Sequence, residues 1–391
     1  MSSPRPQAFR APGRIEGCPR IRARGGDIGT RITAVTCHVS RSKFYVQVES
    51  DAGVSGFGKS SPMRPDVLLQ IHRSVIRPAV LGMDPFQAEA IEERVLRRNY
   101  KIAGQLLAAA FSGLEIALWD LRGRYLGQPV YNLLGGRYRG RVPVYGSSMS
   151  RDLPPAEEAA KLRGAIARLG ITAVKIKVGP RYGSGAPVDL DADEEKVRTV
   201  REAIGPSCRL MLDGNGSYTY IEAVQLYHRV ERYRIHHFEE PCPYRDVEAY
   251  VRLAHSLPVP IHVGEQDWDL FTFRDFISRG ACHLYAADPV KCGGLSSAKR
   301  AATLCRAFGI QYVPHNTTRS IGFAAALHLA ASTPECAGYA EYSIEREDAP
   351  PPVALPFEVR DGCVGVPDGP GLGFHPPEPE ALAATLQAHR D

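Results

Sequence analysis

The stretch VKIKVG, residues 174–179, places Lys175 and Lys177 inside an otherwise apolar run. Its aliphatic residues alternate with the lysines, and this period of two is that of a β-strand, whose successive side chains point to opposite faces. Such a strand either exposes both ammonium groups to water or turns them toward a site that needs two positive charges. The sequence on both sides of it distinguishes these alternatives.

Similar short runs recur from residue 142 to residue 342, and segments with the apolar period of amphipathic helices separate them. This alternation predicts a (β/α)8 barrel over residues 142–355, with an open doubly wound sheet as the alternative. The runs are VPVYG (142–146), AVKIKV (173–178), RLMLD (209–213), IHHFEE (235–240), PIHVGE (260–265), HLYAAD (283–288), IQYVPH (310–315) and GYAEY (338–342).

The region before the barrel, residues 32–141, has a different pattern. Residues 31–49 read as strand, and a turn at residues 51–53 leads back into a second strand, which predicts a β-hairpin. In SGLEIALWDLRGRYLG, residues 112–127, apolar side chains follow a helical stripe until Gly127 ends it. We therefore expect an α+β domain here.

The net charge of +5 is confined to the first 31 residues, which hold seven arginines, one Asp and one Glu. This segment, residues 1–31, is rich in Pro and Gly and is predicted to be a disordered basic tail. Aromatic residues are not interleaved among its arginines, so a nucleic-acid-binding arm is not expected. The nine cysteines form no CxxC pair, which favours reduced thiols. Since no apolar run is long enough to span a membrane, we expect a cytoplasmic protein that binds neither membranes nor nucleic acid.

A series of ionisable residues closes the predicted strands. From Asp213 onward, the ionisable residues at the end of successive runs, or one position before it, lie 26, 26, 23, 27 and 26 positions apart. Because the carboxyl ends of barrel strands meet at one rim, these side chains should line one cavity. Helix N-capping would also explain Asp at these positions, but it suits Glu and His poorly. The residues are Lys177, Asp213, Glu239, Glu265, Asp288, His315 and Glu341.

Asp213, Glu239 and Glu265 end consecutive predicted strands, so three carboxylates should converge. Without compensation they would repel one another, and their pKa values would rise. A hard divalent cation removes this conflict, and an all-oxygen set without His or Cys favours Mg²⁺ over zinc. We therefore predict that these three residues bind Mg²⁺.

The two lysines then have a function. Lys175 and Lys177 precede the predicted metal-binding strands and would point into the same cavity, where each ammonium group lowers the pKa of the other toward that of a general base. Across the barrel, the carboxylate of Asp288 can orient the imidazole of His315. One base on each side of a metal site suits proton transfer at either face of a carbon atom.

These residues and their surroundings resemble the enolase superfamily, specifically its mandelate racemase-like group. The likeness runs from about Ile32 to the C-terminus. It implies an α+β capping domain on a modified (β/α)8 barrel, a last segment (residues 356–391) that returns to the cap, and a homo-oligomer. The matching stretches are SGLEIALWDLRGRYLGQPVYNLLGG, VKIKVG, LMLDGNGSYT, HFEEP, VGEQ, DPVKCGG and VPHNTTRSIGFAAALHLAAS.

By position, the resemblance assigns Mg²⁺ to the same three carboxylates. It also implies roles for the residues around them. By this resemblance, Lys177 is one base, Lys175 lowers its pKa, and the His315–Asp288 pair is the opposite acid/base. Lys175 also contacts the substrate carboxylate, and Glu341 donates a hydrogen bond to it. Asn215 supports the metal site and contacts the substrate, and Lys291 also contacts the substrate.

The implied reaction removes the proton α to a carboxylate of a small-molecule substrate, through an enediolate that Mg²⁺ stabilises. Dehydration of an acid sugar, an aldonate or aldarate, to a 2-keto-3-deoxy acid is the favoured outcome. The alternative is a racemase or epimerase that acts on a 2-hydroxy acid or an amino-acid derivative.

Two other functions can be weighed against these. GVSGFGKS, residues 53–60, matches the phosphate-loop pattern GxxxxGK[ST] of nucleotide hydrolases. However, Pro62 and Pro65 follow it, so no helix is expected to begin where the phosphate would bind. A barrel that keeps only its metal would be a binding protein, but both candidate bases are present. The remaining histidines, His237 and His262 among them, are interpreted as core or surface residues.

Overall fold

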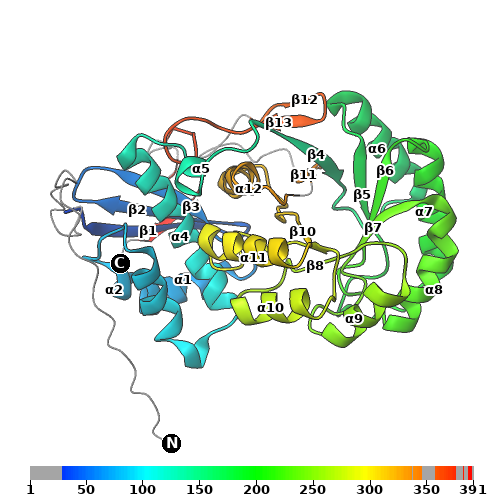
Figure 1. Cartoon of the computed structure of the whole chain (residues 1–391), viewed down its shortest axis with the longest axis horizontal. Helices are drawn as coiled ribbons and strands as arrows, with labels where there is room; N and C mark the ends of the chain where they lie inside the picture. The colour runs from blue at the N-terminus through cyan, green and yellow to red at the C-terminus, as the bar shows by residue number, and fades with distance from the viewer. Residues whose placement is uncertain (1–28, 337, 346–356, 376–381, 383–385, 390–391) are drawn as a thin grey trace, which may run out of the picture.

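The barrel region consists of eight parallel strands that curve around a common centre (Figure 1), and among the described residues no ladder joins the seventh strand, β10, to the eighth, β11. Strands β4 to β10 pair in chain order, and β11 returns to pair with β4. This return excludes the open doubly wound sheet and confirms the predicted barrel. The strands are β4 (Arg141–Ser147), β5 (Ala173–Lys177), β6 (Arg209–Asp213), β7 (Ile235–Glu239), β8 (Ile261–Val263), β9 (Leu284–Tyr285), β10 (Gln311–Tyr312) and β11 (Ala340–Ser343).

This architecture is that of a computed structural model, which describes residues 29–336, 338–345, 357–375, 382 and 386–389. The basic tail predicted for residues 1–31 therefore lies outside the described residues, apart from its last three positions.

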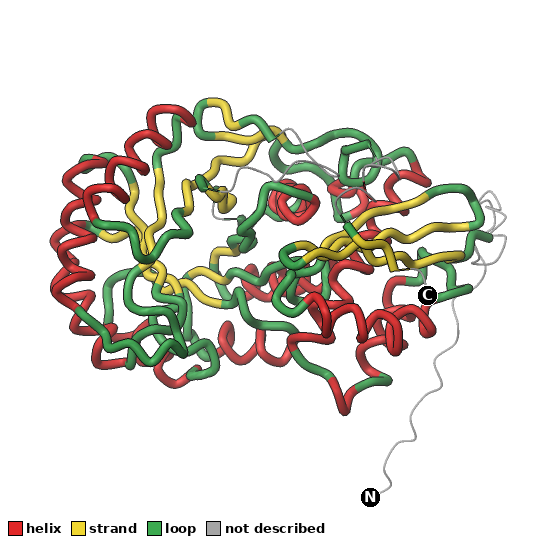
Figure 2. The backbone as a smooth tube through the Cα atoms, turned by 180° about the vertical axis from the view of Figure 1, so that it is seen from behind, coloured by secondary structure: helices red, strands yellow, loops and turns green. Residues whose placement is uncertain are grey.

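Helices follow the barrel strands and cover the outer face of the ring (Figure 2). Several begin at side-chain caps: Thr219 forms a capping box with Glu222, and Asp189 accepts hydrogen bonds from backbone N–H groups in the first turn of the helix that follows it, residues 190–204. The helices are α6 (Pro155–Leu169), α7 (Leu190–Ile204), α8 (Tyr220–Val230), η4 (Glu231–Tyr233), α9 (Val247–Ser256), α10 (Leu270–Ser278), α11 (Leu295–Ala307) and α12 (Ile321–Ala331). Within the described residues, no helix combines the length and apolar character needed to cross a lipid bilayer.

The N-terminal region forms a cap beside the barrel (Figure 1). Its strands β1 (Ile32–Ser40), β2 (Lys43–Ser50) and β3 (Ser55–Lys59) make an antiparallel meander, so the predicted hairpin is confirmed. The long helix α4 (Gln105–Leu126) packs on this sheet and is buried along most of its length. The shorter elements are α1 (Pro65–Ile71), η1 (His72–Ile76), α2 (Arg77–Val80), α3 (Ala88–Glu92), η2 (Glu93–Arg97), η3 (Tyr100–Ile102) and α5 (Val130–Leu133).

The glycines of GVSGFGKS serve this packing rather than a phosphate. A Cβ atom added to Gly58 would lie 1.9 Å from the carbonyl oxygen of Gly113, and one on Gly56 would lie 2.1 Å from that of Ala117. Strand β3 runs through Lys59, and the next helix begins only at Pro65. Because no helix N-terminus follows the glycines in this described segment, the nucleotide-hydrolase alternative is wrong.

The C-terminal segment divides between the two domains. Strands β12 (Val359–Arg360) and β13 (Cys363–Gly365) extend the barrel sheet, because β13 pairs antiparallel with β4. Strand β14 (Gln387–His389) instead pairs antiparallel with β1 of the cap. The segment 356–391 thus contributes to both domains within its described residues, whereas the resemblance implied a return to the cap.

Candidate active site

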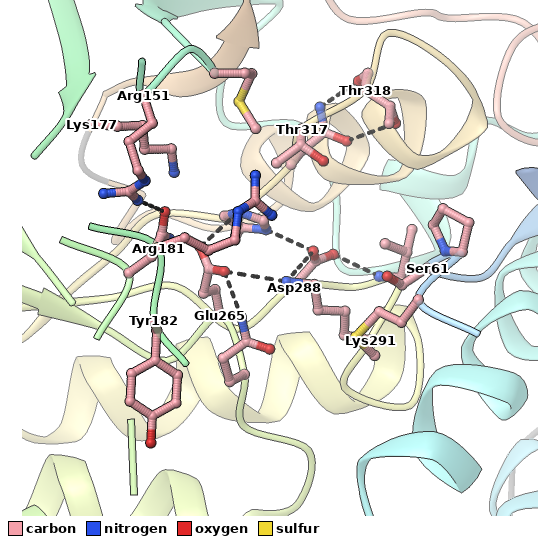
Figure 3. Close-up of a pocket in the computed structure, with 18 of the residues that line it drawn as sticks. Ser61, Arg151, Lys177, Arg181, Tyr182, Glu265, Asp288, Lys291, Thr317 and Thr318 are labelled. Atoms are coloured by element: carbon pink, nitrogen blue, oxygen red, sulfur yellow. Dashed lines mark hydrogen bonds and ion pairs between the residues drawn. The ribbon is translucent and has the colours of Figure 1, made fainter. Parts of the chain in front are cut away.

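The carboxyl ends of the barrel strands and one loop of the cap enclose a cavity of about 950 Å³. Figure 3 shows Lys177 and Arg151 on one side of this cavity, Asp288 and Lys291 on the other, and Glu265 between them. The cap contributes Lys59, Ser61, Pro62 and Met63 to the lining. A ligand in this cavity would therefore contact both domains.

Both lysines of VKIKVG face this end of the barrel rather than water. Lys175 is fully buried, and its Nζ lies 2.7 Å from Glu239 Oε2, 3.0 Å from Glu341 Oε1 and 3.5 Å from Asp213 Oδ2. Lys177 forms an ion pair with the same oxygen of Asp213 and lines the cavity. The solvent-facing interpretation of this strand is therefore wrong.

The ionisation of Lys175 differs from the sequence-based expectation. Burial lowers the pKa of its ammonium group, but the carboxylates of Glu239 and Glu341 more than offset this and hold that pKa well above its usual value. A neighbouring ammonium group was expected to lower it. The expectation fails at this lysine because several carboxylates lie within hydrogen-bonding distance of its Nζ or close to it.

The register of β5, β6 and β7 places two of the predicted metal ligands, Asp213 and Glu239, side by side at the carboxyl ends of neighbouring strands. Lys177 is paired with Asp213 across β5 and β6, and Asp213 is paired with Glu239 across β6 and β7. Glu265 follows β8 by two residues instead of ending it. One ligand atom each from Glu239, Glu265 and His315 lie within 4.8 Å of one another. Asp213 is not part of that compact group and instead contacts the two lysines.

The carboxylates of this group fit a hard cation. Oxygen Oε1 of Glu239 is buried and has no hydrogen-bond partner among the described residues, although its other oxygen is well satisfied. Burial raises the pKa of this carboxyl, yet Lys175 and His262 outweigh burial and keep the pKa well below its usual value. An ionised carboxylate with an unpartnered buried oxygen is a donor that a metal ion would complete.

The predicted histidine–aspartate pair is formed. His315 Nδ1 lies 2.7 Å from Asp288 Oδ2, and its Nε2 lies 2.8 Å from Glu265 Oε2. Since carboxylates accept hydrogen bonds, Asp288 holds the Nδ1–H and orients the ring. Burial lowers the pKa of this imidazole, but Glu265 and other acidic groups raise it overall to about 10.

Neither member of this pair ends a strand, contrary to the sequence prediction. Asp288 follows β9 by three residues, and His315 follows β10 by three. Strands β8, β9 and β10 are only two or three residues long, and the chain beyond them no longer pairs as a regular strand. The side chains nevertheless reach the same cavity.

Glu341 lies within β11, paired with Tyr145 of β4. Its Oε2 lies 3.6 Å from His315 Nε2 and accepts a hydrogen bond from the backbone N–H of Asn316 at 3.4 Å. Burial raises the pKa of Glu341, but Lys175 and His315 more than compensate and lower it overall. Glu341 is thus an acceptor here, and the role implied by the resemblance, donation to a substrate carboxylate by a Glu341 that is protonated when substrate is bound, stays a prediction.

The two remaining predicted substrate contacts, Lys291 and Asn215, have different surroundings. Lys291 Nζ lies 3.4 Å from Glu265 Oε1 and lines the cavity. Asn215 has a left-handed backbone with φ of 46°, and its Oδ1 accepts a hydrogen bond at 2.9 Å from Arg151 Nη2. Arg151 itself lines the cavity and also donates to the carbonyl oxygens of Val178 and Gly179. No sequence signal identified Arg151, because this residue lies in a loop outside the regular spacing of the strand ends.

The fold and the charged rim together define an enzyme of the enolase class. Residues 157–380 match the family described as "Enolase C-terminal domain-like", and residues 28–135 match the "Mandelate racemase / muconate lactonizing enzyme, N-terminal domain". The chain therefore belongs to the mandelate racemase/muconate lactonizing enzyme family of the enolase superfamily.

Several relatives are of nearly equal length. The chain is 35% identical over 352 residues to D-galactarolactone cycloisomerase of Agrobacterium fabrum, covering 85% of this chain and 89% of the relative. It is 28% identical over 363 residues to D-galactonate dehydratase of Xanthomonas euvesicatoria, covering 88% and 91%. The crystal structure of 3,6-anhydro-D-galactonate cycloisomerase from Zobellia galactanivorans superposes with a TM-score of 0.80 at 28% identity, covering 91% of this chain and 99% of that one.

Proposed function

We propose that this enzyme dehydrates an acid sugar, an aldonate or aldarate, to a 2-keto-3-deoxy acid by removing the proton α to its carboxylate. The observation that carries this proposal is the presence of two proton-handling groups in one cavity, Lys177 from β5 and His315 from the loop after β10. Relatives named as dehydratases of galactonate, gluconate and arabinonate support the same chemistry.

A divalent cation, Mg²⁺, is part of this proposal. Glu239 and Glu265 would hold it together with Asp213, whose side chain would leave the lysines to do so. When bound, Mg²⁺ would supply positive charge that stabilises the negative charge developing on the substrate carboxylate. The unpartnered Oε1 of Glu239 supports this assignment.

The chain's own groups would divide the proton transfers. Lys177 is proposed to remove the α proton, since its Nζ lines the cavity beside the predicted metal ligands. His315 is proposed to protonate the departing β-hydroxyl, because Asp288 fixes its Nδ1–H and leaves Nε2 directed toward the Glu265 side of the cavity. Lys291, on the same side, would contact the substrate carboxylate.

A second candidate function follows from the relatives. The cycloisomerase of Agrobacterium fabrum is 35% identical to this chain, and a cycloisomerase is also among the similar solved structures. A lactone substrate would use the same α-proton removal, but its ring oxygen would leave in place of a hydroxyl group. Racemisation or epimerisation would also be possible with two proton-handling groups in one cavity.

One experiment separates these reactions. The purified full-length chain is incubated with Mg²⁺ in D₂O, together with a panel of aldonates, aldarates and their lactones. Appearance of a 2-keto-3-deoxy acid from an open-chain substrate, detected by carbonyl derivatisation and NMR, is the expected result. The same signal from lactones alone would favour the cycloisomerase. Deuterium incorporation with inversion and no keto product would favour the epimerase, and absence of both turnover and exchange across the panel would contradict α-proton removal.

A further inference from the structure

His262 lies on β8, beside the predicted metal ligand Glu239 of β7. The two residues are paired across β7 and β8, and both are 1% exposed. His262 Nδ1 lies 3.1 Å from Glu239 Oε2. Because an ionised carboxylate can only accept hydrogen bonds, His262 must donate its Nδ1–H in this contact.

Oxygen Oε2 of Glu239 therefore receives two donors. Lys175 of β5 places its Nζ 2.7 Å from this oxygen, and His262 contacts the same oxygen from β8, the strand next to β7. Two donors on one oxygen fix the rotation of the carboxylate. The other oxygen, Oε1, is the one without a hydrogen-bond partner among the described residues. We propose that His262 is a positioning residue that holds Glu239 with Oε1 presented to the cation, an inference that rests on the metal site of the proposed function.

His237 offers a comparison within the same layer of the barrel. It is 2% exposed, and its ring lies 4.8 Å from that of His262, centroid to centroid. Its Nδ1 lies 3.2 Å from His236 Nδ1, and no hydrogen bond to Glu239 is found for it among the described residues. Substitution of His237 therefore removes a buried imidazole next to His262 but leaves the hydrogen bond between His262 and Glu239 in place.

Direct metal binding by both histidines is the competing interpretation. One atom each of His237, Glu239 and His262 lie within 4.8 Å of one another, which is a possible ligand set. However, the ammonium group of Lys175 lies 2.7 Å from the carboxylate oxygen that His262 contacts. A cation placed there would face a positive charge at short range. Positioning of the carboxylate is therefore favoured over ligation by the histidines.

The test measures metal affinity rather than turnover. Full-length wild type, His262→Leu, His262→Asn and His237→Leu are titrated with Mn²⁺, and free Mn²⁺ is followed by its EPR signal. Loss of a residue that orients a metal ligand typically weakens binding about 10–100-fold, and this loss is expected for His262→Leu. His262→Asn should bind within a few-fold of wild type, because its amide places a donor near the former Nδ1 position. His237→Leu should also bind as wild type does.

The outcomes distinguish this inference from the function on which it rests. If wild type binds no Mn²⁺, the metal site itself is wrong. If wild type binds and His262→Leu binds equally well, or if His237→Leu loses the same affinity, the positioning role is overturned. A second equivalent of Mn²⁺ that both leucine variants lose would instead assign the histidines as ligands. Should His262→Leu fail to fold, His262→Asn is compared with His262→Gln, whose donor lies near the Nε2 position; equal affinity of these two would overturn the inference.

Discussion

The apolar core of the cap and the mouth of the barrel, which is the charged cavity at the carboxyl ends of the barrel strands, bury very different side chains. In the cap, Phe44 and Phe111 are shielded from water, and the buried carboxylate of Asp120 accepts hydrogen bonds from two backbone N–H groups, at 2.9 Å and 2.7 Å. At the mouth, Lys175 lies within 3.5 Å of three carboxylates. Burial stabilises the cap, whereas at the mouth the desolvation of charges opposes folding. The apolar core of the cap and the charged mouth of the barrel thus differ in what burial does to the free energy of folding.

The pKa values of two buried histidines show this difference. Burial alone dominates at His72 of the cap and lowers its pKa to about 4. His315 of the mouth is also buried, but the acidic groups around it raise its pKa to about 10. The same physical process, removal from water, therefore gives opposite outcomes, because only the mouth supplies partner charges. Substitutions in the two regions should accordingly affect different measurements.

The largest effect is expected at the mouth, on catalysis. Lys177→Ala and His315→Asn should each lower kcat for dehydration by about 10²–10⁴-fold, the usual contribution of a general acid or base. If the proposed division of proton transfers is correct, His315→Asn retains deuterium exchange at the α carbon, while Lys177→Ala loses it. NMR in D₂O measures exchange and keto acid formation in the same sample.

The control for this pair is thermal unfolding. Both variants should melt within a few degrees of wild type, because the cap and the apolar barrel core are unchanged. If both variants lost exchange and product equally, the two roles would not be separate. If turnover fell only in proportion to the folded fraction, the mouth would be a structural site.

A smaller effect is expected in the cap, on stability. Gly58→Ala places a methyl group 1.9 Å from the carbonyl oxygen of Gly113, so β3 and α4 must move apart. Overpacking of this kind costs about 3 kcal/mol in the free energy of unfolding. Chemical denaturation followed by circular dichroism measures this loss.

Gly164 supplies the matched glycine. It lies on the exposed face of α6, where an added Cβ meets no atom within 4 Å. Gly164→Ala should stabilise the protein by about 0.5–1 kcal/mol, because alanine favours the helix over glycine. Equal destabilisation by both substitutions would show that close packing of β3 on α4 is not what requires glycine at position 58.

Much of the barrel could be predicted because its signals are local. The alternation of VKIKVG and the constant spacing of the charged residues both depend on positions near in sequence. The ends of β8, β9 and β10 were predicted two or three residues beyond where these strands stop pairing. Extended segments have the same sequence pattern whether or not they pair with a neighbouring strand. Pairing of β13 with β4 was not predicted, since it joins segments more than 200 residues apart.

The residues of the candidate site could be predicted from the sequence, but their contacts with one another could not. Residue types and spacing indicated that Asp213, Glu239 and Glu265 share a rim. They could not indicate that Asp213 turns to the lysines while Glu239 and Glu265 meet His315. The role of His262 depends on the register of β7 against β8, which determines the residue beside Glu239. From sequence alone, His262 was interpreted as a core or surface residue rather than a functional one.

The smallest predicted effect is the pH dependence of stability from the cap. Because the pKa of His72 is about 4 when folded and about 6.5 when unfolded, the unfolded chain binds the extra proton. Stability from this group is therefore complete above pH 6.5 and is lost as the pH falls toward 4. Linkage gives a loss of about 2 kcal/mol between pH 7 and pH 5.

His72→Gln isolates this contribution. The Nε2 atom of His72 lies 2.9 Å from the carbonyl oxygen of Ala110, and a glutamine amide can donate to the same oxygen without titrating. Denaturation curves of both proteins at pH 7 and pH 5 give the difference directly. The variant should lose about 2 kcal/mol less than wild type over this interval. Equal losses would show that the cap does not hold His72 neutral. They would contradict the proposed difference between a buried histidine without charged partners and His315 at the mouth.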